Sequence, residues 1–160
     1  MRFEDLVRQH AADLYRYAFW LGRDRQQAED VVQEALLRGW RAFPRLREPA
    51  AAKSWLFSIV RNEHYRLAGR SPQAAEVIDL EDIAAPEETF LEMRDALMAL
   101  PASYAEPLAL QVLGGFSCAE IADLLGTTEG AAMTRLTRAR QALRRLLAPP
   151  AKRERTGGRS

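Results

Sequence analysis

The segment at residues 117–147, SCAEIADLLGTTEGAAMTRLTRARQALRRLL, has the pattern of two consecutive helices separated by a tight turn. Ser117 is followed three residues later by Glu120, which is the spacing of a capping box at a helix start. Gly126 follows the last apolar residue of this short helix, and Thr128 is placed to cap a longer one. The segment therefore predicts a helix-turn-helix.

The longer helix of this segment has one apolar face and one arginine-rich face. Its apolar residues recur at intervals of four and three, which makes a single inward stripe. The stripe consists of Ala132, Leu136, Ala139, Leu143 and Leu146. The opposite face carries Thr134, Thr137, Arg138, Gln141 and Arg145, flanked by Arg135, Arg140 and Arg144. Because guanidinium and hydroxyl groups suit base edges and phosphates, this face predicts a helix that enters the DNA major groove.

Positive charge is concentrated in this helix, although the whole chain of 160 residues has a formal net charge of only +1. Residues 135–145 include five arginines and no acid. Residues 68–92 offset them with seven carboxylates and one arginine. Such segregation of charge along a chain is typical of proteins that bind nucleic acid.

The composition excludes several other classes of protein. The longest apolar runs are short and interrupted by charge, so we expect no segment to cross a bilayer. The N-terminus lacks the continuous apolar stretch of a secretory signal. Cys118 is the only cysteine, which excludes an internal disulfide and a multi-cysteine metal site. We therefore expect a cytoplasmic protein that needs no metal or other cofactor.

Helical periodicity recurs along the rest of the chain, and strand signals are nearly absent, so we predict an all-α fold. Three helices are predicted in the first part, at residues 3–22, 24–43 and 55–70. The first places Leu6, Ala11, Leu14 and Ala18 near one face. The second carries an apolar stripe of Ala28, Val31, Val32, Ala35, Leu36 and Trp40. For the third, Ser54 is the expected cap, and the expected inward-facing residues are Trp55, Ile59 and Leu67.

The periodicity is lost between residue 68 and about residue 86, and a structureless connection of this length is unusual inside one compact domain. We therefore predict two small helical domains, at 1–68 and 87–148, joined by a flexible acidic linker at 69–86 and followed by a disordered tail at 149–160.

The second domain is predicted to begin with an amphipathic helix that ends at Pro101. In the next helix, Ser103 and Glu106 have the spacing of another capping box. Pro107 is then expected in the first turn, where its missing N–H costs little.

These segments, in this order, resemble sigma factors of the sigma-70 class, in the small extracytoplasmic-function (ECF, group 4) subfamily. Residues 28–43, AEDVVQEALLRGWRAF, are similar to the part of region 2 that binds core RNA polymerase. Residues 54–67, SWLFSIVRNEHYRL, are similar to its promoter-melting part, and residues 100–143 are similar to region 4. The resemblance implies a polymerase subunit that directs the enzyme to −10 and −35 promoter elements and assists melting, without covalent chemistry of its own.

The resemblance also assigns residues to each contact. Binding of core RNA polymerase is implied for Glu29, Asp30, Gln33, Glu34 and Arg38. Binding of the melted −10 strand, with a base flipped into a pocket, is implied for Arg47, Lys53, Arg61, Asn62, Tyr65 and Arg66. Recognition of the −35 element is implied for Met133, Thr134, Arg135, Thr137, Arg138 and Arg140. A further implied partner is an anti-sigma factor that clamps both domains.

The sequence departs from the pattern of the family in three places, at two single residues and in one loop. Met133 stands where a basic residue is common, and Arg66 stands where an acid is common. The loop EPAAAK at residues 48–53 lacks the Gly-Asp and aromatic residues of relatives. These departures concern which promoter is recognised. His64 has no partner cluster that would indicate a metal or catalysis, so we expect it at the surface.

An alternative is a helix-turn-helix regulator that acts at operators without being a polymerase subunit, but it leaves the basic and aromatic helix at 54–67 unexplained. A purely structural adaptor leaves the arginine-rich helix unexplained. An enzyme acting on nucleic acid is disfavoured, because the sequence shows no paired carboxylates at metal-ligand spacing, no phosphate loop and no nucleophile–base arrangement.

Overall fold

The computed structural model of the chain describes residues 2–69 and 93–147, and in these ranges all regular structure is helical. The first unit contains α1 (Phe3–Gly22), α2 (Arg25–Ala42), the short 3-10 turns η1 (Phe43–Arg45) and η2 (Pro49–Ala51), and α3 (Ala52–Leu67). The second contains α4 (Met93–Ala99), α5 (Ala102–Gly114), α6 (Cys118–Leu125) and α7 (Glu129–Leu146). The predicted linker from residue 70 onward and the predicted tail lie outside the described residues.

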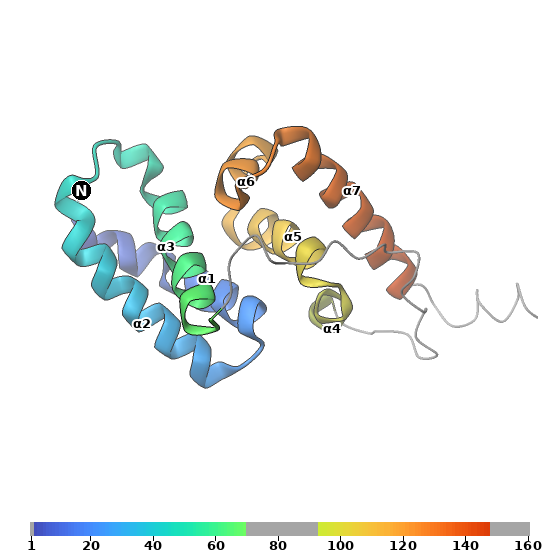
Figure 1. Ribbon diagram of the computed structural model, residues 1–160, viewed down its shortest axis with the longest axis horizontal. Helices are drawn as coiled ribbons and strands as arrows, with labels where there is room; N and C mark the ends of the chain where they lie inside the picture. Colours follow the sequence, from blue (N-terminus) through green and yellow to red (C-terminus); the bar gives the residue numbers. More distant parts are fainter. Residues whose placement is uncertain (1, 70–92, 148–160) are drawn as a thin grey trace, which may run out of the picture.

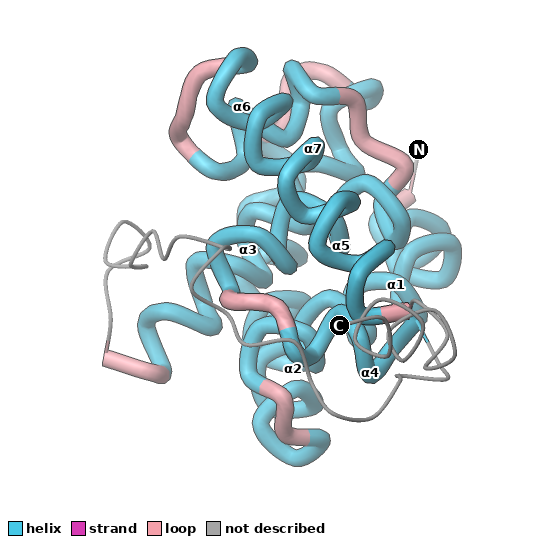
Figure 2. Tube along the Cα trace, turned by 90° about the vertical axis from the view of Figure 1, so that its right-hand side faces the viewer, coloured by secondary structure: helices cyan, strands magenta, loops and turns pink. Residues whose placement is uncertain are grey.

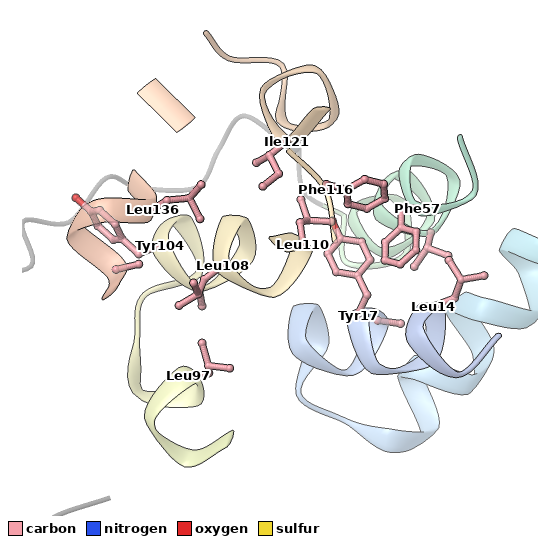
Figure 3. Close-up of a cluster of buried hydrophobic side chains, with 14 of the residues drawn as sticks. Leu14, Tyr17, Phe57, Leu97, Tyr104, Leu108, Leu110, Phe116, Ile121 and Leu136 are labelled. Carbon is pink, nitrogen blue, oxygen red and sulfur yellow. The ribbon is translucent and has the colours of Figure 1, made fainter. Parts of the chain in front are cut away.

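The two units lie side by side, with α1 and α3 of the first facing α5 and α6 of the second (Figure 1). Figure 2 shows in pink the loops and turns of the described residues, and three residues separate α6 from α7. The all-α fold with two helical units is therefore as predicted. The units are not isolated modules, however, because buried residues of both belong to one hydrophobic cluster (Figure 3).

The helix-turn-helix has the predicted local structure. Ser117 and Glu120 form both hydrogen bonds of a capping box, with N–O distances of 3.0 and 3.2 Å. Gly126 ends α6 with a φ of 66°, a left-handed conformation that glycine adopts without steric cost. Thr128 accepts a hydrogen bond from the Ala131 backbone N–H at 3.1 Å and so caps α7. The predicted inward stripe of α7 is buried throughout.

The core of the first unit differs in part from the sequence prediction. On α3 the buried apolar residues are Leu56, Phe57 and Val60, whereas the predicted Trp55 and Ile59 are only partly buried. Both predictions assumed one inward face, but α3 packs against α1 and α2 and also approaches α6. Contact with three neighbouring helices makes the buried face of α3 wider than one stripe. The most buried residues therefore stand next to the predicted ones in the sequence.

Two large apolar residues assigned to inward stripes are exposed. Trp40 is 61% exposed near the end of α2, and Leu67 is 47% exposed at the end of α3. Both lie in the last turn of their helices, beyond most of the packing that buries the earlier positions. These two predictions were wrong.

The start of α3 also corrects a prediction. The helix begins at Ala52, directly after the turn that Pro49 opens, and Ser54 lies inside its first turn. The Ser54 hydroxyl donates to the Ala51 carbonyl at 3.1 Å instead of accepting from the backbone as a cap would. Ser54 is therefore not the N-cap, because the preceding 3-10 turn already leads the chain into the helix.

The capping box predicted for α5 is absent as well. The helix begins at Ala102, so Ser103 lies within it, and the buried Ser103 hydroxyl has no hydrogen-bond partner among the described residues. Pro107 lies inside the helix rather than in its first turn. Its ring removes one backbone hydrogen bond, a cost that α5 tolerates while buried between neighbouring helices. Glu106 extends toward the first unit instead of back to the helix start.

Replacing Thr128 with alanine tests the cap of α7. Loss of the cap is expected to lower the free energy of unfolding by about 1 kcal/mol, because the Ala131 N–H loses its acceptor. Urea unfolding followed by far-ultraviolet circular dichroism measures this change. Thr128→Ser keeps the hydroxyl and is the matched control. An equal loss in both variants would contradict the capping role.

Candidate DNA and partner interfaces

The face of α7 predicted to contact DNA is open to solvent. Met133 is 52% exposed, Thr134, Thr137, Arg138 and Arg140 are exposed, and Arg135 is half-buried. The Thr134 and Thr137 hydroxyls donate to the carbonyls of Gly130 and Met133, each at 3.0 Å. With their protons engaged within the helix, both hydroxyl oxygens face outward as acceptors, which suits amino groups on base edges better than phosphates.

The arginines of α7 differ in their surroundings. Arg138 makes no hydrogen bond or ion pair with any described residue, so its whole guanidinium is available for a ligand. Arg140 instead donates to the Gln111 side chain on α5. Arg144 and Arg145 lie in the last turn, where positive charge also complements the helix dipole. Arg138 is therefore the residue of this face best placed to contact a base.

The exposed face of α2 combines acidic and large apolar side chains. Asp30, Gln33, Leu37 and Trp40 recur at intervals of three, four and three, so they form one stripe along the helix. All are exposed, Leu37 by 51% and Trp40 by 61%. A surface stripe with a tryptophan at one end and a carboxylate at the other is typical of a protein-binding surface. From the sequence, Trp40 is expected in an inward stripe, and Leu37 is not singled out.

Other residues predicted to bind the polymerase take part in contacts within the first unit. Arg38 pairs with Glu34 on its own helix at 3.4 Å and with Glu63 on α3 at 2.9 Å. Glu63 is 3% exposed and also pairs with Arg66. This hydrogen bond, with the nearby charge, raises the pKa of Arg66. The charge of Arg38 is therefore largely balanced inside the unit, while Glu29 and Asp30 remain exposed.

The residues predicted to bind the −10 strand fall into two groups. Arg47, Asn62 and Arg66 are exposed. Lys53, Arg61 and Tyr65 instead contact the second unit. The Lys53 ammonium donates to the Gly114 carbonyl and lies 5.2 Å from the centre of the Phe116 ring.

The contacts of Arg61 and Tyr65 converge on the carboxylate of Glu106. The Arg61 Nε donates to it at 2.6 Å, and the Tyr65 hydroxyl donates at 3.4 Å. The hydroxyl of Tyr17 on α1 donates at 2.7 Å. Although burial opposes it, the charge of Glu106 raises the pKa of Arg61. Burial, together with the same carboxylate, raises the pKa of Tyr65 to about 12 and that of Tyr17 well above its ordinary value.

His64 corrects another prediction, because it is buried on α3 rather than at the surface. Its ring meets the Tyr65 ring edge to face at a centroid distance of 4.9 Å. In residues 2–69 and 93–147 no group of three or more histidine, cysteine or carboxylate side chains is arranged to hold a metal ion. None of the helices in those ranges has the length and apolar character needed to traverse a bilayer.

A helix-turn-helix with an open arginine face, packed against a second helical unit, defines a DNA-binding transcription factor. The comparisons with known proteins are more specific. The family model for sigma-70 region 2 matches residues 6–71, and the model for sigma-70 region 4 matches residues 90–143. The chain therefore belongs to the sigma-70 family of RNA polymerase sigma factors.

Similar curated proteins belong to the ECF group. The chain is 35% identical over 150 residues to the ECF RNA polymerase sigma factor SigM of Mycobacterium tuberculosis, covering 91% of this chain and 76% of that protein. It is 36% identical over 151 residues to SigL of the same species, covering 87% and 85%. The family and the function predicted from the sequence are thus confirmed: this is an ECF-type sigma factor, which binds core RNA polymerase, directs it to promoters and assists melting.

Solved structures show the same fold. The sigma factor RpoE of Bartonella quintana, in complex with the anti-sigma factor NepR, matches with a TM-score of 0.71 and 30% identity, covering 91% of this chain and 96% of that one. CnrH, in complex with the cytosolic domain of CnrY, matches with a TM-score of 0.65 and 27% identity, covering 91% and 86%.

The buried His10 on α1 generates a pH prediction. Burial, together with the positive charge of Lys53, lowers the His10 pKa below 6.5, with Asp13 opposing the shift. The unfolded chain therefore binds a proton at higher pH than the folded chain. Consequently the free energy of unfolding should fall as pH decreases from neutrality through 6.5 to the lower pKa of the folded state.

Unfolding by urea at a series of pH values checks this dependence. In His10→Gln, the part of the slope due to His10 should disappear, whatever the absolute stability of the variant. An unchanged slope would mean that His10 titrates alike in the folded and unfolded chains.

Proposed function

We propose that three surfaces of the chain divide the work of transcription initiation. The exposed stripe of α2 binds core RNA polymerase, the loop at residues 47–53 and α3 bind the −10 strand, and α7 recognises the −35 element. The observation that carries this proposal is the pairing of two exposed surfaces of different chemistry, an acidic and apolar stripe on α2 and an arginine face on α7.

The α2 stripe suits a basic partner surface with an apolar centre. Trp40 and Leu37 offer large apolar area that water now covers, and burying such area drives association. Asp30 and Glu29 add negative charge that attracts a basic partner and orients it. The pairing of Arg38 with Glu63 supports the stripe indirectly, because it joins α2 to α3.

For the −35 element, Arg138 supplies two or more donors to a base edge, most favourably to guanine. Thr134 and Thr137 supply acceptors beside it. Arg135 and Arg140 flank this centre and bind phosphates, which positions the helix without recognising sequence. Met133 offers only an apolar contact, so it fits a thymine methyl group rather than a phosphate.

For the −10 strand, Arg47, Asn62 and Arg66 form the part of the surface that is exposed. Lys53, Arg61 and Tyr65 complete it once the second unit no longer contacts them. Cationic groups then hold the strand backbone, and the Tyr65 ring offers a flat surface for a base taken out of the duplex. The chain performs no covalent step, because binding energy alone opens the duplex, and it acts in the cytoplasm together with the polymerase.

An anti-sigma factor is a further partner in this proposal, as it is for RpoE of Bartonella quintana. A groove of about 630 Å³ spans both units and has room for a segment of such a partner. Its apolar lining includes Tyr15, Phe19, Trp20, Leu97, Val112 and Leu113. Its charged lining is Arg16, Arg25 and Glu29, so cations outnumber carboxylates and favour a segment carrying acidic side chains. A segment bound there contacts both units at once.

Changing the two ends of the α2 stripe tests the polymerase contact. Asp30→Arg combined with Trp40→Ala should weaken association with core RNA polymerase by about thirtyfold or more, the effect of losing one interface hot spot. Both residues are exposed, so the fold should persist. Fluorescence anisotropy with purified core enzyme measures the affinity.

The matched control for this test is Asp123→Arg with Val112→Ala, which makes the same kinds of change at exposed positions of the second unit. The control should bind core polymerase as the wild type does. Equal affinity of all three proteins would remove the α2 stripe from the polymerase contact.

Arg138→Ala tests the −35 contact. The variant should lose about 1–3 kcal/mol of binding on the preferred −35 sequence and much less on a −35 sequence with one altered base pair. The measurement is binding of polymerase holoenzyme to both promoters. Arg144→Ala, at the far end of α7, is the comparison and should weaken both promoters alike. Uniform loss with Arg138→Ala would reduce this residue to a phosphate contact.

A further inference from the structure

One buried carboxylate joins the two units. Glu106 lies on α5 and is only 7% exposed. Within the described residues, every hydrogen bond to its carboxylate comes from the first unit, from Tyr17 on α1 and from Arg61 and Tyr65 on α3. We propose that Glu106 is an internal latch, which holds the chain in a closed state by occupying residues of the −10 surface. This inference rests on the proposed function of α3.

The chemistry of the latch imitates that of a DNA strand. A carboxylate and a backbone phosphate are both anionic acceptors, so the guanidinium of Arg61 can bind either. Tyr65 donates its hydroxyl to Glu106 and is only 8% exposed, so in the closed state its ring is not open to stack on a base. Neither residue can serve the latch and the strand at once. Binding of the −10 strand therefore requires that Glu106 release α3.

Other groups of the second unit, besides the Glu106 carboxylate, also cover residues of the −10 surface. Lys53, also predicted to bind the −10 strand, is held by the Gly114 carbonyl and the Phe116 ring. Phe116 in turn packs edge to face on Phe57 of α3, with a centroid distance of 5.1 Å (Figure 3). A Cβ atom at Gly114 would lie 2.3 Å from the Phe116 ring, so glycine lets Phe116 fold back toward α3. Three of the six predicted −10 residues are thus covered by the second unit.

The buried contact between Glu106 and the first unit can break as well as form. A buried ion pair gains attraction but loses the hydration of both charges, so its net contribution is much smaller than its short distances suggest. When the units separate, water solvates Glu106 and Arg61 again. When only one partner loses its charge, the other remains buried and unpaired, which favours separation. The closed fraction therefore depends on the charge of Glu106, and the apparent affinity for single-stranded DNA is reduced by that fraction.

Glu106→Gln in the full-length chain tests the latch. Glutamine keeps the shape of the side chain but leaves Arg61 without its counter-charge. Energy transfer between dyes attached in the variant Arg8→Cys with Asp123→Cys, in a Cys118→Ser background, reports the separation of the units. These two labelling positions are exposed and lie in different units. The variant should shift the distance distribution toward larger separations.

The same variant should bind a fluorescein-labelled single-stranded DNA of random sequence about five- to tenfold more tightly, the range of a modest coupling between two sites. Asp95→Asn, an exposed carboxylate of the same unit, is the matched control and should change neither reading. An unchanged distance distribution and unchanged DNA affinity in folded Glu106→Gln would overturn the proposal.

Tyr17→Phe provides a second, milder test if Glu106→Gln does not fold. It removes one donor to Glu106 and keeps the ring that packs on Phe57. It should shift both readings in the same direction by a smaller amount, and no shift would overturn the latch. Capture by core polymerase separates this inference from the proposed function. A chain that opens but never binds the enzyme contradicts only the function, and a chain that binds without ever being closed contradicts only the latch.

Discussion

The relative orientation of the two units that the structure describes depends on the ion pair between Arg61 and Glu106, because it joins the helix-turn-helix unit to the first unit. The pair is short, nearly enclosed and supported by the Tyr17 and Tyr65 hydroxyls. Around it, Phe116 covers Phe57 with apolar surface. The polar centre selects one orientation of the two units, and the apolar surroundings supply most of the area that is removed from water.

The parts of this structure that the sequence predicts well are those determined by neighbours within a few residues. The capping box of α6, the left-handed Gly126 and the inward stripe of α7 each follow from spacings of four residues or fewer. The same holds for the exposed face of α7, since a helix with one buried stripe must present the opposite side to solvent. The family resemblance also rests on these local patterns.

Several of the failures depend on whether residues far apart in the sequence come into contact. Ser103 and Glu106 match a capping box as well as Ser117 and Glu120 do, but 89 residues separate Glu106 from its partner Tyr17. Trp40 has the spacing of a core residue, yet no helix of the described chain packs over the end of α2 to bury it. His64 looks like a surface residue by its polarity, and it is buried because α3 has neighbours on several sides.

In the proposed latch, the same residues of the first unit serve the contact with the second unit and the −10 strand. This double use has a physical basis in the limited chemistry of side chains. A surface that must bind single-stranded DNA needs cations and aromatic rings, and a folded neighbour can satisfy both with a carboxylate, a carbonyl and another ring. Glu106, the Gly114 carbonyl and Phe116 do this for Arg61, Lys53 and α3. Such a surface would otherwise attract any polyanion, because phosphate contacts do not depend on sequence. Covering it with groups that imitate DNA limits nonspecific binding, while the contacts remain weak enough overall for the promoter strand to replace them.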